Sequence, residues 1–220
     1  MTLPLPLTGP TARPAAGGDP RSIVVFLHGY GSNGDDLIGL APYWQAALPH
    51  TLFIAPNSPQ ACPGQPGGYQ WWNLMSRSEE ERTDGVGQSA PALNAFIDAQ
   101  LVQYGLAASK LALVGFSQGT MMALHVGPRR AQALAGIAGY SGLLVNPRAL
   151  PKDVASKPPV ILIHGDADLV VPVTASYEAH GVLMGLEFET ALHISSRLGH
   201  SIDEAGLRHG GAFLSRVLES

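Results

Sequence analysis

A serine lies between two glycines in the stretch G-F-S-Q-G at residues 115–119, which follows the apolar run 111–114 and precedes a second apolar segment. This order predicts a strand, a tight turn at Ser117 and a helix, in which a Cβ at either glycine would collide with neighbouring backbone. The turn lifts the serine hydroxyl above the edge of a sheet, and the first N–H groups of the helix point toward the group it attacks. The motif therefore predicts a nucleophilic serine. Because the chain contains 26 glycines, the string can also arise by chance, so partners must be found elsewhere.

A serine hydroxyl becomes a good nucleophile when a histidine removes its proton and a carboxylate orients that histidine. After a serine in such a turn, the acid and then the histidine are expected on loops that follow later strands. The apolar run 160–163 leads into H-G-D-A-D at 164–168, which offers two aspartates. Asp166 lies nearest the strand end and is predicted to cap the turn through its side chain. Asp168, just before the apolar stretch 169–172, is the favoured acid.

Eight histidines compete for the role of the base. His200, in L-G-H-S at 198–201, follows both the serine and the acid and lies between the last predicted strand and the last predicted helix. His28 and His164 each precede a glycine at a strand end and are expected to be structural. The others are expected inside helices, at the opposite end of the sheet or on the surface: His50, His125, His180, His193 and His209. His200 is therefore the predicted base.

Attack on an ester carbonyl places negative charge on its oxygen, which aligned backbone donors stabilise. One donor is predicted to be the N–H of Gln118, the residue after the nucleophile. The second should come from the loop after the first strand, from either Leu27 or a neighbour in the turn 28–30.

The same loop supports a rival class of protein, because Gly29, Gly31 and Gly34 match the G-x-G-x-x-G pattern of dinucleotide-binding proteins. In that class an acidic residue ends the next strand and holds the ribose. Here the predicted strand 52–55 is followed by P-N-S, so the dinucleotide-binding hypothesis is disfavoured. No metal site is predicted, because the chain has no H-E-x-x-H motif and the aspartates at 164–168 could gather a cation only by folding tightly on themselves.

Short apolar runs alternate with helical patterns along the whole chain, and this predicts an α/β protein with a mostly parallel sheet covered by helices on both faces. Strands are predicted at 22–27, 52–55, 111–114, 134–138, 160–163 and 186–194, and helices at 36–47, 85–104, 118–126, 174–184 and 202–218. Residues 1–21 are expected to be an irregular lead-in, and residues 22–220 a single domain. The segment 139–159 is too short for an inserted lid domain. The longest irregular stretch, 56–84, contains Trp71 and Trp72.

The amino-acid composition and net charge disfavour several classes of function. With 45% hydrophobic and 14% charged residues the chain is globular, and its net charge of −4 disfavours nucleic-acid binding. No apolar run is long enough to span a bilayer, and the N-terminal segment lacks the features of a secretion signal. The single cysteine, Cys62, fits a reducing compartment, so the cytoplasm is the expected location.

Several segments together resemble the phospholipase/carboxylesterase family, small α/β-hydrolases that include acyl-protein thioesterases and bacterial carboxylesterases. They are L-H-G-Y-G at 27–31, G-F-S-Q-G at 115–119, S-G at 141–142, H-G-D-A-D at 164–168 with V-P at 171–172, and G-H-S at 199–201. The resemblance extends from about Ser22 to the C-terminus. It implies Ser117, Asp168 and His200 as the catalytic triad, the N–H groups of Leu27 and Gln118 as the oxyanion hole, and no cofactor.

The predicted function is that of a serine carboxylesterase that hydrolyses small-molecule esters with short to medium acyl chains. An acyl-thioesterase or a lysophospholipase with the same triad is the main alternative, and a non-catalytic binding protein is a more remote one. Thioesterases of the family commonly carry a Trp-aromatic-Asp run where this chain has W-W-N at 71–73, which disfavours depalmitoylation of proteins. The tight turn at Ser117 between the strand and the helix is called the elbow. Apolar side chains expected near it are candidates for the acyl site: Trp71, Trp72, Leu143, Leu144 and Val170. An exposed apolar rim around an open site would serve lipid contact or a homodimer equally well, and no stable membrane insertion is expected.

Overall fold

A seven-stranded sheet forms the centre of the protein in the computed structural model, which describes residues 7–76 and 78–219. The strand order is β1-β3-β2-β6-β7-β8-β9; β1 pairs antiparallel with β3, and every other pair is parallel. The strands are β1 (Thr11–Ala12), β2 (Ser22–Leu27), β3 (Thr51–Ile54), β6 (Leu111–Phe116), β7 (Gly136–Tyr140), β8 (Val160–Gly165) and β9 (Thr190–Ser195). Two further short strands, β4 (Gln60–Ala61) and β5 (Tyr69–Gln70), form a separate antiparallel hairpin.

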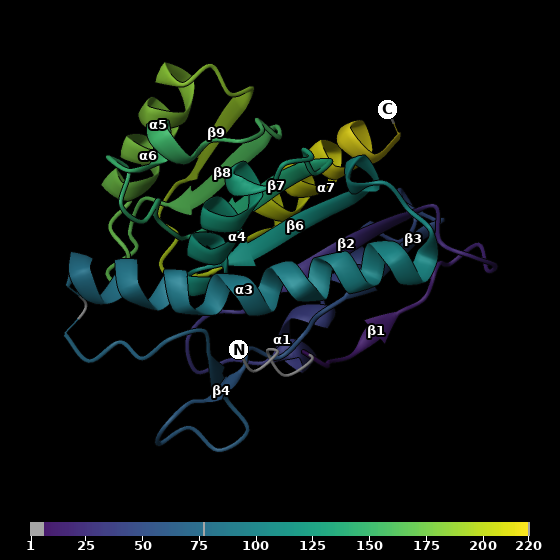
Figure 1. The fold of residues 1–220 in the computed structure, drawn as a ribbon, viewed down its shortest axis with the longest axis horizontal. Helices are drawn as coiled ribbons and strands as arrows, with labels where there is room; N and C mark the ends of the chain where they lie inside the picture. Colours follow the sequence, from purple (N-terminus) through teal and green to yellow (C-terminus); the bar gives the residue numbers. More distant parts are fainter. Residues whose placement is uncertain (1–6, 77, 220) are drawn as a thin grey trace.

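Helices cover both faces of this sheet (Figure 1). They are α1 (Gly34–Ile38), α2 (Ala41–Trp44), α3 (Glu79–Tyr104), α4 (Gln118–Arg129), α5 (Leu150–Asp153), α6 (Thr174–Gly185) and α7 (Glu204–Glu219), with a 3₁₀ turn at Ala108–Lys110. In Figure 1 the long helix α3 runs across the front of the molecule, and β4 belongs to a loop that projects below it. This is the mostly parallel, helix-covered sheet that the alternating pattern predicts, and it agrees with the α/β-hydrolase fold that the family resemblance implies.

The strands are apolar throughout because each of their two faces meets a layer of helices. On β2, Ile23 and Val25 pack into the cluster that includes residues of α3, α4 and α6. Phe26, on the opposite face of β2, packs against Trp44 of α2 in the cluster that also includes α7. Burial of each such side chain contributes roughly 1.5–3 kcal/mol, so the two layers hold the sheet rigid beneath the loops at its carboxyl edge.

Two predicted elements were wrong in extent near the N-terminus. The helix expected over 36–47 is interrupted, because α1 ends at Ile38 and α2 begins at Ala41, with Pro42 in its first turn. Proline lacks an N–H and is accommodated only at the start of a helix, so Pro42 begins a new helix there. Within the lead-in expected to be irregular, Thr11–Ala12 forms β1 and pairs with Phe53 and Ile54.

Two boundaries farther along the chain also differ from the prediction. Helix α3 begins at Glu79 instead of residue 85, because Ser78 caps it by accepting a hydrogen bond from the N–H of Glu81 at 3.0 Å. The strand expected over 186–194 is displaced to Thr190–Ser195. Leu186 still bonds back to the carbonyl of Val182, and so it belongs to the end of α6.

The connection from β7 to β8 leaves the carboxyl edge of the sheet uncovered by any inserted domain. Residues 141–159, all of them described, contain one helix of four residues, α5. In the described part of the chain, none of the helices combines the length and the apolar character that crossing a bilayer demands.

Candidate active site

Ser117 occupies the turn between β6 and α4 in a conformation that few non-glycine residues adopt, with φ 53° and ψ −114°. Its backbone N–H donates to the carbonyl of Tyr140 at 2.9 Å, which ties the turn to the neighbouring strand β7. A Cβ at Gly115 would overlap the backbone of Gly119 and Thr120, and a Cβ at Gly119 would overlap the carbonyl oxygen of Leu27. Both flanking glycines are therefore required by close backbone approach, as the motif predicts.

Asp168 follows β8 in a tight turn, and its carboxylate is completely buried. One oxygen, Oδ1, accepts hydrogen bonds from the N–H groups of Val170 at 2.8 Å and Val171 at 2.9 Å. The other, Oδ2, lies 2.7 Å from Nδ1 of His200. Burial alone would raise the pKa of Asp168, but the hydrogen bonds from His200, Val171 and Val170 outweigh it and lower the pKa. The carboxylate is therefore held ionised, and it faces the imidazole.

The competing aspartate has a different partner. Oδ1 of Asp166 accepts a hydrogen bond from the N–H of Arg197 at 2.5 Å, and the residue is exposed. It thus joins the loop after β8 to the loop after β9, which carries His200. A Cβ at Gly165 would overlap the carbonyl oxygen of Leu198, so these two loops are in close contact.

His200 and Ser117 line the same open cavity, of about 340 Å³, at the carboxyl edge of the sheet. The His200 ring packs against Phe116 with ring centroids 4.9 Å apart. Since Nδ1 donates to Asp168, the other ring nitrogen, Nε2, is available to accept a proton. The structure thus brings together three residues that the sequence placed far apart: Ser117, Asp168 and His200. The described lining is Gly29, Tyr30, Ser32, Asp36, Leu37, Leu40, Phe116, Ser117, His200, Ser201 and Ile202.

The turn after β2 supplies the opposite wall of this cavity. Gly29 and Tyr30 line it, whereas Leu27 is fully buried within β2, in register with Gly115 of β6. Leu27 is not among the described lining residues but ends β2 directly before this turn, so the second oxyanion donor stays a prediction, either the N–H of Leu27 or that of a neighbour in the turn 28–30. The glycines of the G-x-G-x-x-G match serve packing and turn geometry: Gly31 has φ +78°, and a Cβ at Gly34 would overlap the carbonyl oxygen of Ala55.

Gln118 begins α4 directly after the serine and is almost completely buried. Its side-chain oxygen accepts from the N–H of Trp71 at 2.9 Å, and its amide nitrogen donates to the carbonyl of Trp72 at 2.8 Å. Gln118 thus anchors the loop that carries Trp71 and Trp72 to the start of α4. The backbone N–H of Gln118 lies in the first turn of α4, where helix N–H groups lack partners within the helix.

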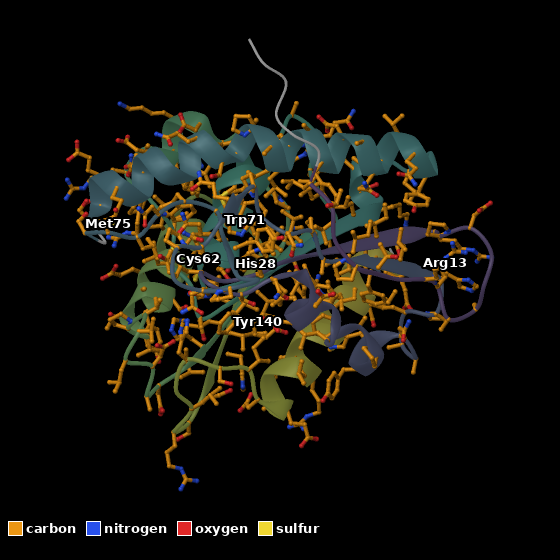
Figure 2. All side chains as sticks on the ribbon, turned by 90° about the horizontal axis from the view of Figure 1, so that it is seen from below. Arg13, His28, Cys62, Trp71, Met75 and Tyr140 are labelled. Carbon is orange, nitrogen blue, oxygen red and sulfur yellow. The ribbon has the colours of Figure 1, made fainter. Side chains whose placement is uncertain are left out.

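The residues proposed for the acyl site do not line this cavity. Trp71 has no exposed surface, since its ring stacks on His28 and its Nε1 donates to the carbonyl of His28 at 3.1 Å (Figure 2). Trp72 is buried against Gly85, where a Cβ would overlap the indole. Leu143 and Leu144 line a separate cavity of about 220 Å³. Val170 is 52% exposed on the turn after Asp168. The two tryptophans are therefore core residues that support the loop.

The histidines that were expected to be structural have partners that fix them. Nδ1 of His28 lies 2.8 Å from the carbonyl of Gly29, and Nε2 accepts from the N–H of Ser58 at 3.0 Å. Burial lowers the pKa of His28, so the ring is neutral and holds the turn after β2. His209 is exposed as predicted, and its ring lies 4.0 Å from that of His193.

Several lining residues escaped the sequence analysis, although three of them lie within or beside recognised motifs. Ser32 and Asp36 follow the H-G-Y-G stretch, and the serine hydroxyl donates to the carboxylate of Asp36 at 2.7 Å. Phe116 is the unassigned residue of the elbow motif itself. Ile202 lies two positions beyond His200. As for metals, no group of three or more His, Cys, Asp or Glu side chains able to hold an ion occurs among residues 7–76 and 78–219.

Comparison with known proteins identifies relatives that are esterases and thioesterases. The family described as Phospholipase/Carboxylesterase matches residues 14–218. Acyl-protein thioesterase 1 of Schizosaccharomyces pombe is 33% identical over 176 residues, which cover 76% of this chain and 77% of that protein. Esterase YpfH of Escherichia coli is 24% identical over 86% of this chain and 79% of its own length. The crystal structure of esterase PE8 superposes with a TM-score of 0.93 and 44% identity, covering 97% of this chain and 100% of that one.

Proposed function

Because this chain belongs to the phospholipase/carboxylesterase family and is a hydrolase of carboxylic esters, we propose that it is a serine esterase in which Ser117, His200 and Asp168 are the catalytic residues. One observation carries the assignment of the residues. The imidazole of His200 lies 2.7 Å from the Asp168 carboxylate and shares a cavity with the strained Ser117. A serine, a histidine and a buried carboxylate in this order suit acyl transfer.

In the first half of the proposed reaction, Nε2 of His200 takes the hydroxyl proton of Ser117 while Oγ attacks the carbonyl carbon of the ester. The tetrahedral intermediate collapses, the bond to the alcohol breaks, and His200 returns the proton to the leaving oxygen. In the second half, His200 takes a proton from the water that attacks the acyl carbon. The bond to Oγ of Ser117 then breaks, His200 returns the proton to Oγ, and the carboxylic acid is released. Asp168 stays ionised and stabilises the imidazolium formed in each half.

The oxyanion is proposed to lie between two elements that meet at the elbow. One donor is the N–H of Gln118 at the start of α4. The other is the N–H of Leu27 or of a neighbour in the turn 28–30, whose Gly29 and Tyr30 line the cavity with Ser117. In a serine protease, loss of one such donor lowers kcat by about 10²–10³-fold, so a large effect on the rate is expected from the placement of this turn.

The substrate is proposed to be a small ester with a short to medium acyl chain. The open cavity of about 340 Å³ is at the small end of ligand pockets and has room for a compact ester. The 44% identity to esterase PE8 supports an ester, whereas the 33% identity to an acyl-protein thioesterase supports a thioester as the alternative. A lysophospholipid is the third candidate.

Hydrolysis of p-nitrophenyl esters of graded chain length tests the function and ranks the candidates. Wild type, Ser117→Ala and Ser215→Ala are compared, since Ser215 lies on α7 away from the cavity and makes a matched serine control. We expect Ser117→Ala to lose activity and Ser215→Ala to keep it. Acyl thioesters and lysophospholipids of equal chain length then measure the preference. Equal turnover by wild type and Ser117→Ala would contradict the serine mechanism.

We also propose that the enzyme acts in the cytoplasm, where a lone buried cysteine, Cys62, stays reduced. Fractionation of the native host tests the cytoplasmic location. Thiol labelling of the recovered protein after unfolding tests whether Cys62 is reduced. Recovery of the protein outside the cytoplasm would contradict the location. Self-association is a separate question, and light scattering of the purified protein decides between a monomer and a homodimer.

A further inference from the structure

The carboxylate of Asp168 has a second imidazole beside it that the proposed reaction does not use. Its Oδ2 lies 2.7 Å from Nδ1 of His200 and 3.2 Å from Nε2 of His164, four residues earlier at the end of β8. The side chains of His164 and Asp168 have no exposed surface. A buried histidine in contact with the acid of a triad influences how that acid is held.

The partners of His164 fix which of its nitrogens carries a proton. Nε2 lies 2.9 Å from the carbonyl oxygen of Val171, which can only accept a hydrogen bond. Nε2 must therefore bear a proton, which it donates to the Val171 carbonyl, while Oδ2 of Asp168 lies 3.2 Å from the same nitrogen. Nδ1 lies 2.7 Å from the hydroxyl of Ser176, a buried residue on α6, and this contact fixes the rotation of the ring.

Hydrogen bonds to His164 and Asp168 hold the turn 168–171 in place. The backbone of Val171 both donates its N–H to Oδ1 of Asp168 and accepts from Nε2 of His164. The N–H of Val170 provides a further donor to Oδ1. The carboxylate thus has donors on both oxygens, and it cannot rotate without breaking several of them.

We propose that His164 is a positioning residue of the ester hydrolase: its Nε2–H, held in place by Ser176, fixes the Val171 carbonyl and thereby the turn 168–171, whose N–H groups orient the Asp168 carboxylate so that Oδ2 faces His200. His164 acts through Asp168 and is absent from the described lining of the cavity. Its loss should therefore lower kcat and leave KM unchanged. A misplacement of about 1 Å can cost on the order of 10²-fold in rate, so a decrease in kcat of at least about tenfold is expected.

Two substitutions of His164 test the roles of its two ring nitrogens, Nε2 and Nδ1, separately. Glutamine places its amide nitrogen near the position of Nε2 and keeps a donor toward the carbonyl of Val171. Asparagine places its amide near Nδ1, where it reaches Ser176 and leaves the Val171 carbonyl without this donor. With a neutral p-nitrophenyl ester, we expect His164→Asn to lower kcat at constant KM and His164→Gln to recover most of that loss.

A spectroscopic readout distinguishes positioning from general support of the fold. The proton on Nδ1 of His200, in its hydrogen bond to Asp168, gives a downfield ¹H resonance that labelling the histidine ring nitrogens with ¹⁵N assigns. We expect this resonance in wild type and in His164→Gln, and its broadening or upfield displacement in His164→Asn. Midpoints of thermal unfolding, recorded on the same samples, show whether each variant is folded.

If His164→Asn does not fold, Ser176→Ala replaces it, because this change leaves the imidazole in place and removes the partner that fixes its rotation. We then expect a loss of kcat of about threefold, comparable to one neutral hydrogen bond, with broadening of the His200 resonance. A folded variant of either kind with wild-type kcat and an unchanged resonance would overturn the positioning role. This inference rests on the proposed function, which fails separately if Ser117→Ala retains activity.

Discussion

Asp166 and Arg197 join the two loops that carry the acid and the base, through a hydrogen bond of 2.5 Å from the backbone N–H of Arg197 to the carboxylate of Asp166. Arg197 has a positive φ of 59°, which is unfavourable for a residue with a side chain and is held by this bond. The loop that carries His200 is thus fixed at Arg197 by a residue two positions from Asp168. Asp166 therefore ties the loop of the proposed base, His200, to the loop of the proposed acid, Asp168.

Replacing Asp166 by alanine should therefore affect both stability and rate. Loss of a hydrogen bond to a charged acceptor costs about 1.5–3 kcal/mol in general, and exposure reduces the loss here to the lower end of that range. We expect a lower free energy of unfolding in urea and a severalfold lower kcat. Asp166→Asn retains an acceptor and serves as the control. An alanine variant with unchanged stability and kcat would show that the loop is held by other contacts.

The elbow glycine Gly119 should not tolerate a side chain. A Cβ there would overlap the carbonyl oxygen of Leu27, and the three nearest atoms all belong to the backbone of Leu27 and His28, which cannot give way as a flexible side chain would. We expect Gly119→Ala to lower the free energy of unfolding by about 3 kcal/mol or more and to abolish activity, as overpacking at rigid sites does. Chemical denaturation measures the stability.

Gly181→Ala is the matched control for that substitution. Gly181 lies in α6 with nothing within 4 Å of its would-be Cβ. Alanine there should stabilise the protein by roughly 0.5–1 kcal/mol through its higher helix propensity. Equal destabilisation by the two substitutions would contradict the packing of the elbow.

The buried carboxylate of Asp168 makes stability depend on pH in a defined direction. Its pKa in the folded state is below the ordinary value, so the unfolded chain binds the proton more readily. The stabilisation is therefore fully present above the pKa of the unfolded state, about 3.9, and is lost as the pH falls through the lower folded value. We expect wild type to exceed Asp168→Asn in free energy of unfolding near neutral pH and to lose that advantage in acid. A constant difference across the range would contradict an ionised, hydrogen-bonded Asp168.

The same substitution should nearly abolish catalysis near neutral pH. An asparagine at this position presents a donor to Nδ1 and favours the wrong tautomer of His200. The corresponding change in a serine protease lowers kcat by about 10⁴-fold. Assays with a p-nitrophenyl ester measure the effect, and a loss smaller than tenfold would mean that Asp168 does not orient the base.

Asp36 should bias the enzyme against anionic esters. Its carboxylate is part of the cavity wall, and no lysine or arginine occurs among the described residues of that wall. A like charge about 4 Å away in water costs about 1 kcal/mol, which corresponds to roughly fivefold in kcat/KM. Asp36→Asn should raise kcat/KM for an ester that carries a carboxylate, relative to a neutral ester of equal size. The gain should shrink in high salt, and an equal effect on both esters would remove the electrostatic explanation.

The sequence predicted which residues meet at the site better than it predicted their surroundings. The close approach of backbone at the glycines beside Ser117, the pairing of Asp168 with His200, and the burial of the parallel strands follow from local rules, and the structure has all three features. The acyl-site candidates Trp71 and Trp72 were wrong as cavity residues because apolar character does not distinguish a ring stacked on His28 from one facing solvent. Ser32 and Asp36 were missed since a cavity wall arises only when the turn after β2 folds over the elbow.

A covalent acyl-enzyme on Ser117 is the central claim, and mass spectrometry after rapid acid quenching of a reaction with a p-nitrophenyl ester tests it most directly. We expect the intact mass of wild type to increase by one acyl group, and the modified peptide to contain Ser117. The Ser117→Ala variant should show no adduct and no turnover. Turnover of the ester by Ser117→Ala, or an acyl group found on another residue of an active wild-type enzyme, would contradict the account.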